Sequence, residues 1–189
     1  MKCSLESPEL LHHCQRMSRR FVLFSVVASA FVFTITAALP FGFLNSSIPV
    51  SFGERLSIAL RLESAALLFV VFAILRVAIL RGTDGKGVMG QREGTAPETE
   101  IAIRVLNNTT EQFLLSFPSH LVLSLLLPDD KLAVLLGFVS LWLTARAMFM
   151  IGYKVDHPMG RELGFQLTFV PTIIVIVYNC VFGLLLWTY

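Results

Sequence analysis

The sequence predicts an all-α integral membrane protein with five transmembrane helices. Of its 189 residues, 55% are hydrophobic and only 15% are charged, and the mean hydropathy is +0.73. Soluble domains carry about 25% charged residues, so this chain has too few charges to cover its surface in water. The apolar residues also gather in five stretches of roughly the 20 residues that a bilayer requires. These stretches lie near residues 21–39, 57–80, 101–127, 132–153 and 163–187.

The first stretch follows Arg19 and Arg20 and ends before Pro40. A cleaved signal peptide is the alternative reading, but such peptides have an apolar core of only about 7–15 residues. We therefore expect a retained helix, with a hydrophilic segment over residues 1–20 and the extra helix over 21–44. Residues 57–188 would then form a separate domain of four helices.

Short segments of polar residues, glycine and proline separate the four later stretches. The longest loop runs from Gly82 to Pro97 and contains four more glycines. The third and fourth stretches are joined only by Pro128, Asp129, Asp130 and Lys131, which predicts a tight turn between antiparallel helices.

The distribution of basic residues predicts the orientation. Lysine and arginine near helix ends stay in the cytosol. With a cytosolic N-terminus, all but three of the 15 basic residues fall on the cytosolic side. The C-terminus and the sequon at Asn45 would then be lumenal, which makes Asn45 a candidate glycosylation site. Cys14 lies just before the first span and is a candidate for palmitoylation.

Two other partners are not expected. A net charge of +2, with scattered basic residues, does not favour nucleic acid. His12, His13 and Cys14 lack a second ligand pair at the spacing of a metal site, so no metal is predicted.

The third stretch carries a stripe of polar residues. Arg104, Asn108 and Glu111 are spaced i, i+4 and i+7, and Glu100 lies one turn earlier on the same helix face. Ionisable groups inside a span are costly, so each is a candidate functional residue. We expect an inward-facing polar site at the cytosolic end of the helix. The alternative is a polar seam that only joins helices together.

The fourth stretch adds Arg146 and Tyr153, and Arg161 follows in the next loop. Antiparallel neighbours would bring these residues to the depth of the stripe on the third stretch. Arginine pairs with carboxylates through two hydrogen bonds, and a glutamate suits an amine, so the set predicts a zwitterionic, peptide-like ligand. The alternative for Arg146 is that its side chain extends to the membrane interface.

These two motifs together resemble those of the membrane-associated proteins in eicosanoid and glutathione metabolism, the MAPEG family. The resemblance spans about residues 60 to 187. It implies an antiparallel four-helix bundle, a homotrimer, and glutathione bound between protomers near the cytosolic face. The implied ligand-binding residues are Arg76 from a neighbouring protomer, Glu100, Arg104, Asn108, Glu111, Arg146, Tyr153 and Arg161.

The resemblance also implies a chemistry. Cationic groups near the sulfur would favour the thiolate of glutathione, the nucleophilic form, and Arg161 and Tyr153 are the candidate catalytic residues. Two positions depart from the family pattern, because Phe149 stands where a hydrogen-bonding side chain is frequent and Gln112 where some members have tyrosine. These changes affect catalysis more than binding.

The extra first helix and the run from Asn107 to Phe113 resemble the five-span, mattrin-like members of the family. That likeness implies a Golgi or other secretory-pathway membrane, and a mainly structural or regulatory role in trafficking or barrier function, with other membrane proteins as partners. The alternative function is a membrane-bound glutathione transferase or peroxidase acting on lipophilic electrophiles.

Overall fold

The computed structural model describes residues 22–32, 34–35, 50–83, 96–155 and 158–187. These residues are helical almost throughout and include no strand, which confirms the all-α class. The long helices are α2 (Phe52–Thr83), α3 (Pro97–Leu126), α4 (Val134–Lys154) and α5 (Pro158–Trp187), with the short 3-10 helix η3 (Asp129–Lys131) between α3 and α4.

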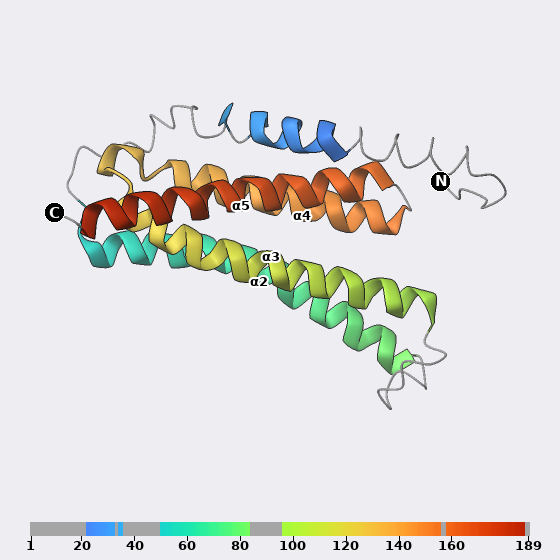
Figure 1. Cartoon of the computed structure of the whole chain (residues 1–189). Coiled ribbons are helices and arrows are strands. Elements are labelled where there is room, and N and C mark those ends of the chain that lie inside the picture. The colour runs from blue at the N-terminus through green and yellow to red at the C-terminus, as the bar shows by residue number, and fades with distance from the viewer. Residues whose placement is uncertain (1–21, 33, 36–49, 84–95, 156–157, 188–189) are drawn as a thin grey trace.

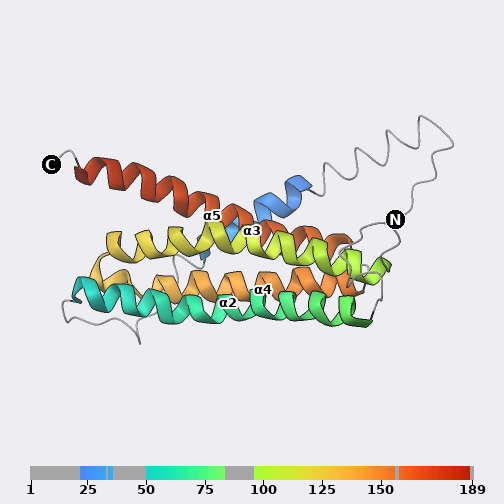
Figure 2. The same cartoon turned by 90° about the horizontal axis from the view of Figure 1, so that it is seen from below.

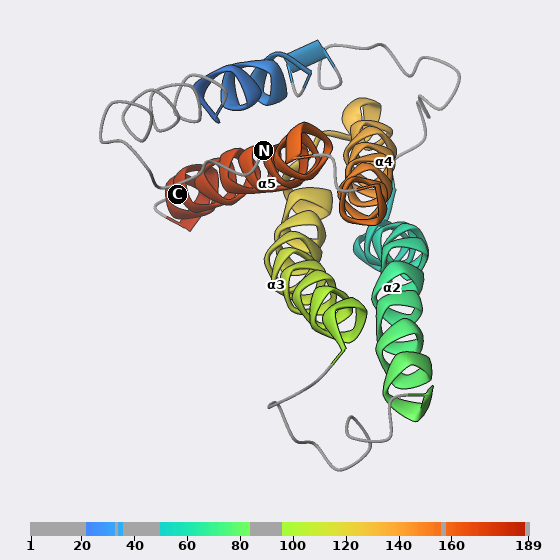
Figure 3. The ribbon, with the colours of Figure 1, turned by 90° about the vertical axis from the view of Figure 1, so that its right-hand side faces the viewer.

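The four long helices form an antiparallel bundle, as expected (Figure 1). α4 packs most extensively on α5, and α2 on α3. A shorter helix, Val22–Val32, lies on the side of α5 and α4 that faces away from α2 and α3 (Figures 1 and 3). Cys14 and Asn45 lie outside the described residues.

The bundle has two ends (Figure 2). The end formed by residues 50–56 and 124–136 carries η3, and we call it the hairpin end. The opposite end is formed by the end of α2, the start of α3, the end of α4 and the start of α5, and we call it the loop end.

Three helices are long and apolar enough to cross a membrane: Phe52–Thr83, Asp129–Lys154 and Pro158–Gly183. They contain the second and fourth predicted spans, 57–80 and 132–153, and the fifth, 163–187, up to Gly183. α3 has 30 residues, long enough to span at about 1.5 Å per residue, but its polar first half keeps it out of the apolar group. The described helix of the first predicted span is shorter, at Val22–Val32.

α2 packs through small residues at seven-residue spacing. Ala59, Ala66 and Ala73 are buried at intervals of seven, and Val70 and Val77 repeat the same interval. Small side chains let helix backbones approach closely in a membrane, and a seven-residue period keeps one face against its partner. The opposite face of α2 is therefore left to lipid or to another chain.

Candidate functional site

Arg146 is the centre of a buried polar cluster at the junction of three helices. Its side chain is completely buried. Nη1 donates to Asn108 Oδ1 of α3 at 2.8 Å, and Nη2 donates to Thr168 Oγ1 of α5 at 2.5 Å. The predicted contact between polar residues of α3 and α4 is confirmed for Asn108 and Arg146, but the two helices are not close neighbours, because each packs more on α2 and on α5 than on the other. The alternative in which Arg146 extends to the interface is wrong.

Two glycines allow this approach. A Cβ at Gly164 would lie 2.6 Å from the backbone nitrogen of Phe149 and 2.7 Å from the carbonyl oxygen of Ala145. Only a residue without a side chain fits there, so α5 lies directly against α4. The Gly164 carbonyl can then accept a hydrogen bond from Arg146 Nη2 at 3.3 Å. At the end of α4, a Cβ at Gly152 would meet the Arg161 backbone nitrogen at 2.6 Å.

Aromatic rings complete the surroundings of the Arg146 guanidinium. Its central carbon lies 4.5 Å from the ring centroid of Phe149 and 6.0 Å from that of Trp142. Such rings attract a cation through their negative faces. The structure thus gives Phe149, which cannot hydrogen-bond, a place beneath the arginine. Dipoles and rings surround the charge, and no carboxylate of the described residues pairs with it.

The rest of the α3 stripe points outward. Arg104 donates to Glu100 at 2.6 Å, and their side chains are 63% and 60% exposed. Glu111 is exposed as well. We expected the whole stripe to face the interior of the bundle, and within one chain this is wrong for Arg104 and Glu111. Of these two residues and Asn108, only Asn108 turns inward.

Tyr153 and Arg161 meet at the loop end. The Arg161 guanidinium lies over the Tyr153 ring, 4.9 Å from its centroid. Phe149 packs edge-on against the same ring, with centroids 5.1 Å apart. Both Tyr153 and Arg161 are half-buried, and so is Arg76 near the end of α2. These positions place three predicted site residues at one end of the bundle.

A second buried polar pair was not predicted. His120 Nδ1 of α3 lies 2.5 Å from Glu63 Oε1 of α2, and both side chains are at most 4% exposed. The other oxygen, Oε2 of Glu63, is buried without a hydrogen-bond partner in the described part of the chain. The signal available in the sequence was that Glu63 lies within the second predicted span and His120 within the third, because ionisable residues inside a span are costly.

At the hairpin end, Arg55 links α2 to the end of α3 and to η3. Its guanidinium pairs with Asp129 and donates to the carbonyl oxygens of Ser124 at 3.0 Å and Leu127 at 2.5 Å. Arg55 thus satisfies carbonyl groups at the end of α3, which have no partner within that helix.

The comparison with protein families gives one match. The MAPEG family model matches residues 61–181, which contain the Arg146 cluster and every candidate ligand-binding residue. Comparisons with curated proteins and with solved structures gave no match. Because the family model covers more than half of the sequence, this chain belongs to the MAPEG family.

Proposed function

We propose that this membrane protein binds glutathione, or a similar anionic peptide, at the loop end and uses the site in a structural or regulatory role in the secretory pathway, as mattrin-like members would. The observation that carries this proposal is the exposure of Arg104 and Glu111 on a helix of spanning length. Exposed charges on a spanning helix are costly, and the ion pair found for Arg104 is with Glu100, which is itself exposed on the same helix. A zwitterionic peptide would supply a carboxylate for the arginine and an amine for the glutamate.

The remaining residues fit the same ligand. Asn108 Oδ1 accepts from Arg146, so its amide NH2 is the group left to donate to a peptide carbonyl or carboxylate. Arg146 is then a positioning residue, because it is buried beneath the site. Arg161 and Tyr153 stand at the same end and would hold the second carboxylate or the sulfur.

We also propose that the chain forms a homotrimer and that the four-helix domain comprises residues 57–188. The charged face of α3 would be completed by Arg76 of a neighbouring copy. The N-terminus would be cytosolic and the C-terminus lumenal, in a Golgi or ER membrane. Crosslinking in membranes would test the assembly, with a single-chain band in every condition as the contrary result.

The test of the ligand site is a thermal-shift titration of the detergent-solubilised protein with glutathione. A ligand that binds only the folded state raises its apparent stability. We expect a rise that is lost in Arg104→Ala and kept in Lys131→Ala, a control that removes an exposed cation at the hairpin end. No rise at millimolar glutathione would contradict the proposal.

The second candidate function is a glutathione transferase or peroxidase. The cation of Arg161 over the Tyr153 ring favours it, since a fixed cation could stabilise a thiolate. The absence of a hydrogen-bonding group at Phe149 opposes it. Incubation with glutathione and a lipophilic electrophile separates the two functions. Binding without turnover supports the first, and turnover that Arg161→Ala abolishes supports the second.

A further inference from the structure

Arg61 is an isolated cation on the outward face of α2. The packed face of this helix is formed by Ala59, Glu63, Ala66, Val70, Ala73 and Val77. At 100° per residue, Arg61 lies almost opposite these residues. It is exposed, and no hydrogen bond or ion pair to it is found in the described part of the chain. Arg55, six residues earlier, is instead hydrogen-bonded to carbonyl groups of the hairpin end.

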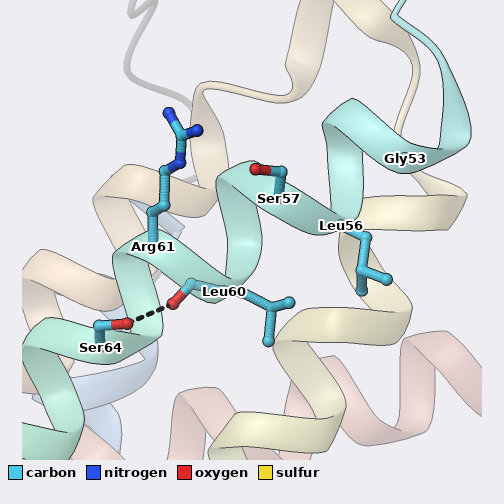
Figure 4. A pocket seen from close by; sticks show the side chains of 6 residues that line it. All are labelled: Gly53, Leu56, Ser57, Leu60, Arg61 and Ser64. Carbon is cyan, nitrogen blue, oxygen red and sulfur yellow. Dashed lines mark hydrogen bonds between the residues drawn. The ribbon is translucent and has the colours of Figure 1, made fainter.

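A shallow, open groove on the surface of α2 borders the arginine. It is lined by residues of α2 alone: Gly53, Leu56, Ser57, Leu60, Arg61 and Ser64. Figure 4 shows the Arg61 side chain extending away from α2, with Ser57 and Ser64 about one turn to either side. The Ser64 hydroxyl donates to the Leu60 carbonyl at 2.8 Å, whereas no hydrogen bond of the Ser57 hydroxyl is found among the described residues. The groove therefore offers one cation and one available hydroxyl, and none of its lining residues is acidic.

The depth of Arg61 matches a lipid headgroup. α2 has 32 residues, about 48 Å at 1.5 Å per residue, against a hydrocarbon core of about 30 Å. A centred helix would put the Arg61 backbone roughly 5 Å inside the hydrocarbon boundary. Side chains of a helix tilt toward its N-terminus, and the N-terminus of α2 is at the hairpin end. The guanidinium can therefore reach the headgroup region on that side.

An apolar stripe continues from Arg61 toward the membrane centre. Leu68 and Phe72, at i+7 and i+11, are 66% and 58% exposed, and Leu75 and Ile79 extend the same stripe. We propose that α2 carries a binding site for one anionic phospholipid, with the phosphate held by Arg61 and Ser57 and an acyl chain lying on Leu68 and Phe72. Charge-assisted hydrogen bonds from a guanidinium suit a phosphate. This site is at the opposite end of the bundle from the proposed glutathione site.

Native mass spectrometry of the full chain in detergent, titrated with phosphatidylglycerol, tests the site. We expect wild-type protein to retain one tightly bound phosphatidylglycerol per chain. Loss of one charge-assisted contact should weaken its affinity about tenfold in Arg61→Ala. Arg61→Lys should keep most of the binding, and Lys131→Ala should keep all of it. The melting temperature without lipid should be unchanged in Arg61→Ala, because Arg61 lies away from the packed face.

Diacylglycerol with the same acyl chains is the second probe, since it lacks the phosphate. It should not compete with phosphatidylglycerol. Equal binding of phosphatidylglycerol by wild type and Arg61→Ala would overturn the proposal, as would equal binding of diacylglycerol and phosphatidylglycerol by wild type. Dissociation of an oligomer in Arg61→Ala with no change in lipid binding would also overturn it and would assign the groove to a second copy.

Discussion

The interior of the bundle and the outward face of α3 carry the same kinds of side chain in opposite states. Inside, Arg146 and Glu63 are almost completely buried, and each is hydrogen-bonded to a group from another helix. Outside, the bond found for Arg104 in the described part of the chain is with Glu100 of its own helix, and Glu111 is exposed. The interior partners all come from one chain, so these residues belong to the fold. Among the residues that the structure describes, no partner from another helix is found for these outward charges, which is expected of a surface that binds a ligand or a second copy.

The largest loss of stability is expected when Arg146 is substituted. Arg146→Ala removes three hydrogen bonds and leaves a cavity among Trp142, Phe149 and Thr168. Truncation of a large buried side chain costs about 3–5 kcal/mol, so we expect a sharp loss of folded protein and of melting temperature in detergent. Lys154→Ala is the matched control, because it removes an exposed basic residue at the end of the same helix. A variant at Arg146 that melts like wild type would mean that this cluster does not hold the bundle together.

The second largest loss of stability is expected when the buried pair of Glu63 and His120 is broken. Glu63→Ala leaves the His120 ring buried without its partner, and an unsatisfied buried polar group costs about 1–3 kcal/mol. Thermal unfolding measures this loss, and Glu63→Gln should recover part of the stability by keeping a hydrogen-bonding group.

A double-mutant cycle with His120→Leu checks that the two residues act together. Removing both partners should cost less than the sum of the single changes, because no polar group is then left alone. Additive losses would show that the close contact between them contributes nothing to stability.

The ion pair between Arg55 and Asp129 at the hairpin end is intermediate in exposure, and its contribution to stability should be intermediate too. Asp129→Ala removes the ion pair with Arg55, which keeps its bonds to three backbone carbonyl groups. We expect a loss of about 0.5–1.5 kcal/mol, typical of one hydrogen bond. The neighbouring Asp130 is the control, since it is 62% exposed and lies 3.7 Å from Lys131. Equal losses of stability in Asp129→Ala and Asp130→Ala would show that the ion pair of Arg55 with Asp129 contributes no more than the exposed pair of Asp130 with Lys131.

Sequence patterns predicted the bundle because they depend on short distances along the chain. The four-residue turn after α3 keeps α3 and α4 antiparallel in one bundle, which is why the contact of Asn108 with Arg146 could be predicted. The turn does not make the two helices close neighbours, because each of them packs more on α2 and on α5 than on the other. Helical spacing places Arg104 and Glu111 on one stripe but does not determine which way that stripe faces. Glu63 and His120 are 57 residues apart, and their contact depends on the register of α2 against α3, which no local pattern specifies.

The smallest effect on stability is expected at Arg104. Its ion pair with Glu100 is an exposed i,i+4 pair, worth about 0.3–0.5 kcal/mol and weakened further by salt. Arg104→Ala should therefore melt within about two degrees of wild type in the absence of ligand, since 1 kcal/mol shifts the melting temperature by about 2–4 °C for a chain of this size. If the outward face is a binding surface, the same variant should lose its stabilisation by glutathione. A large loss of stability in ligand-free Arg104→Ala would instead place Arg104 with Arg146 among the residues that hold the fold, and the contrast between the two regions would fail.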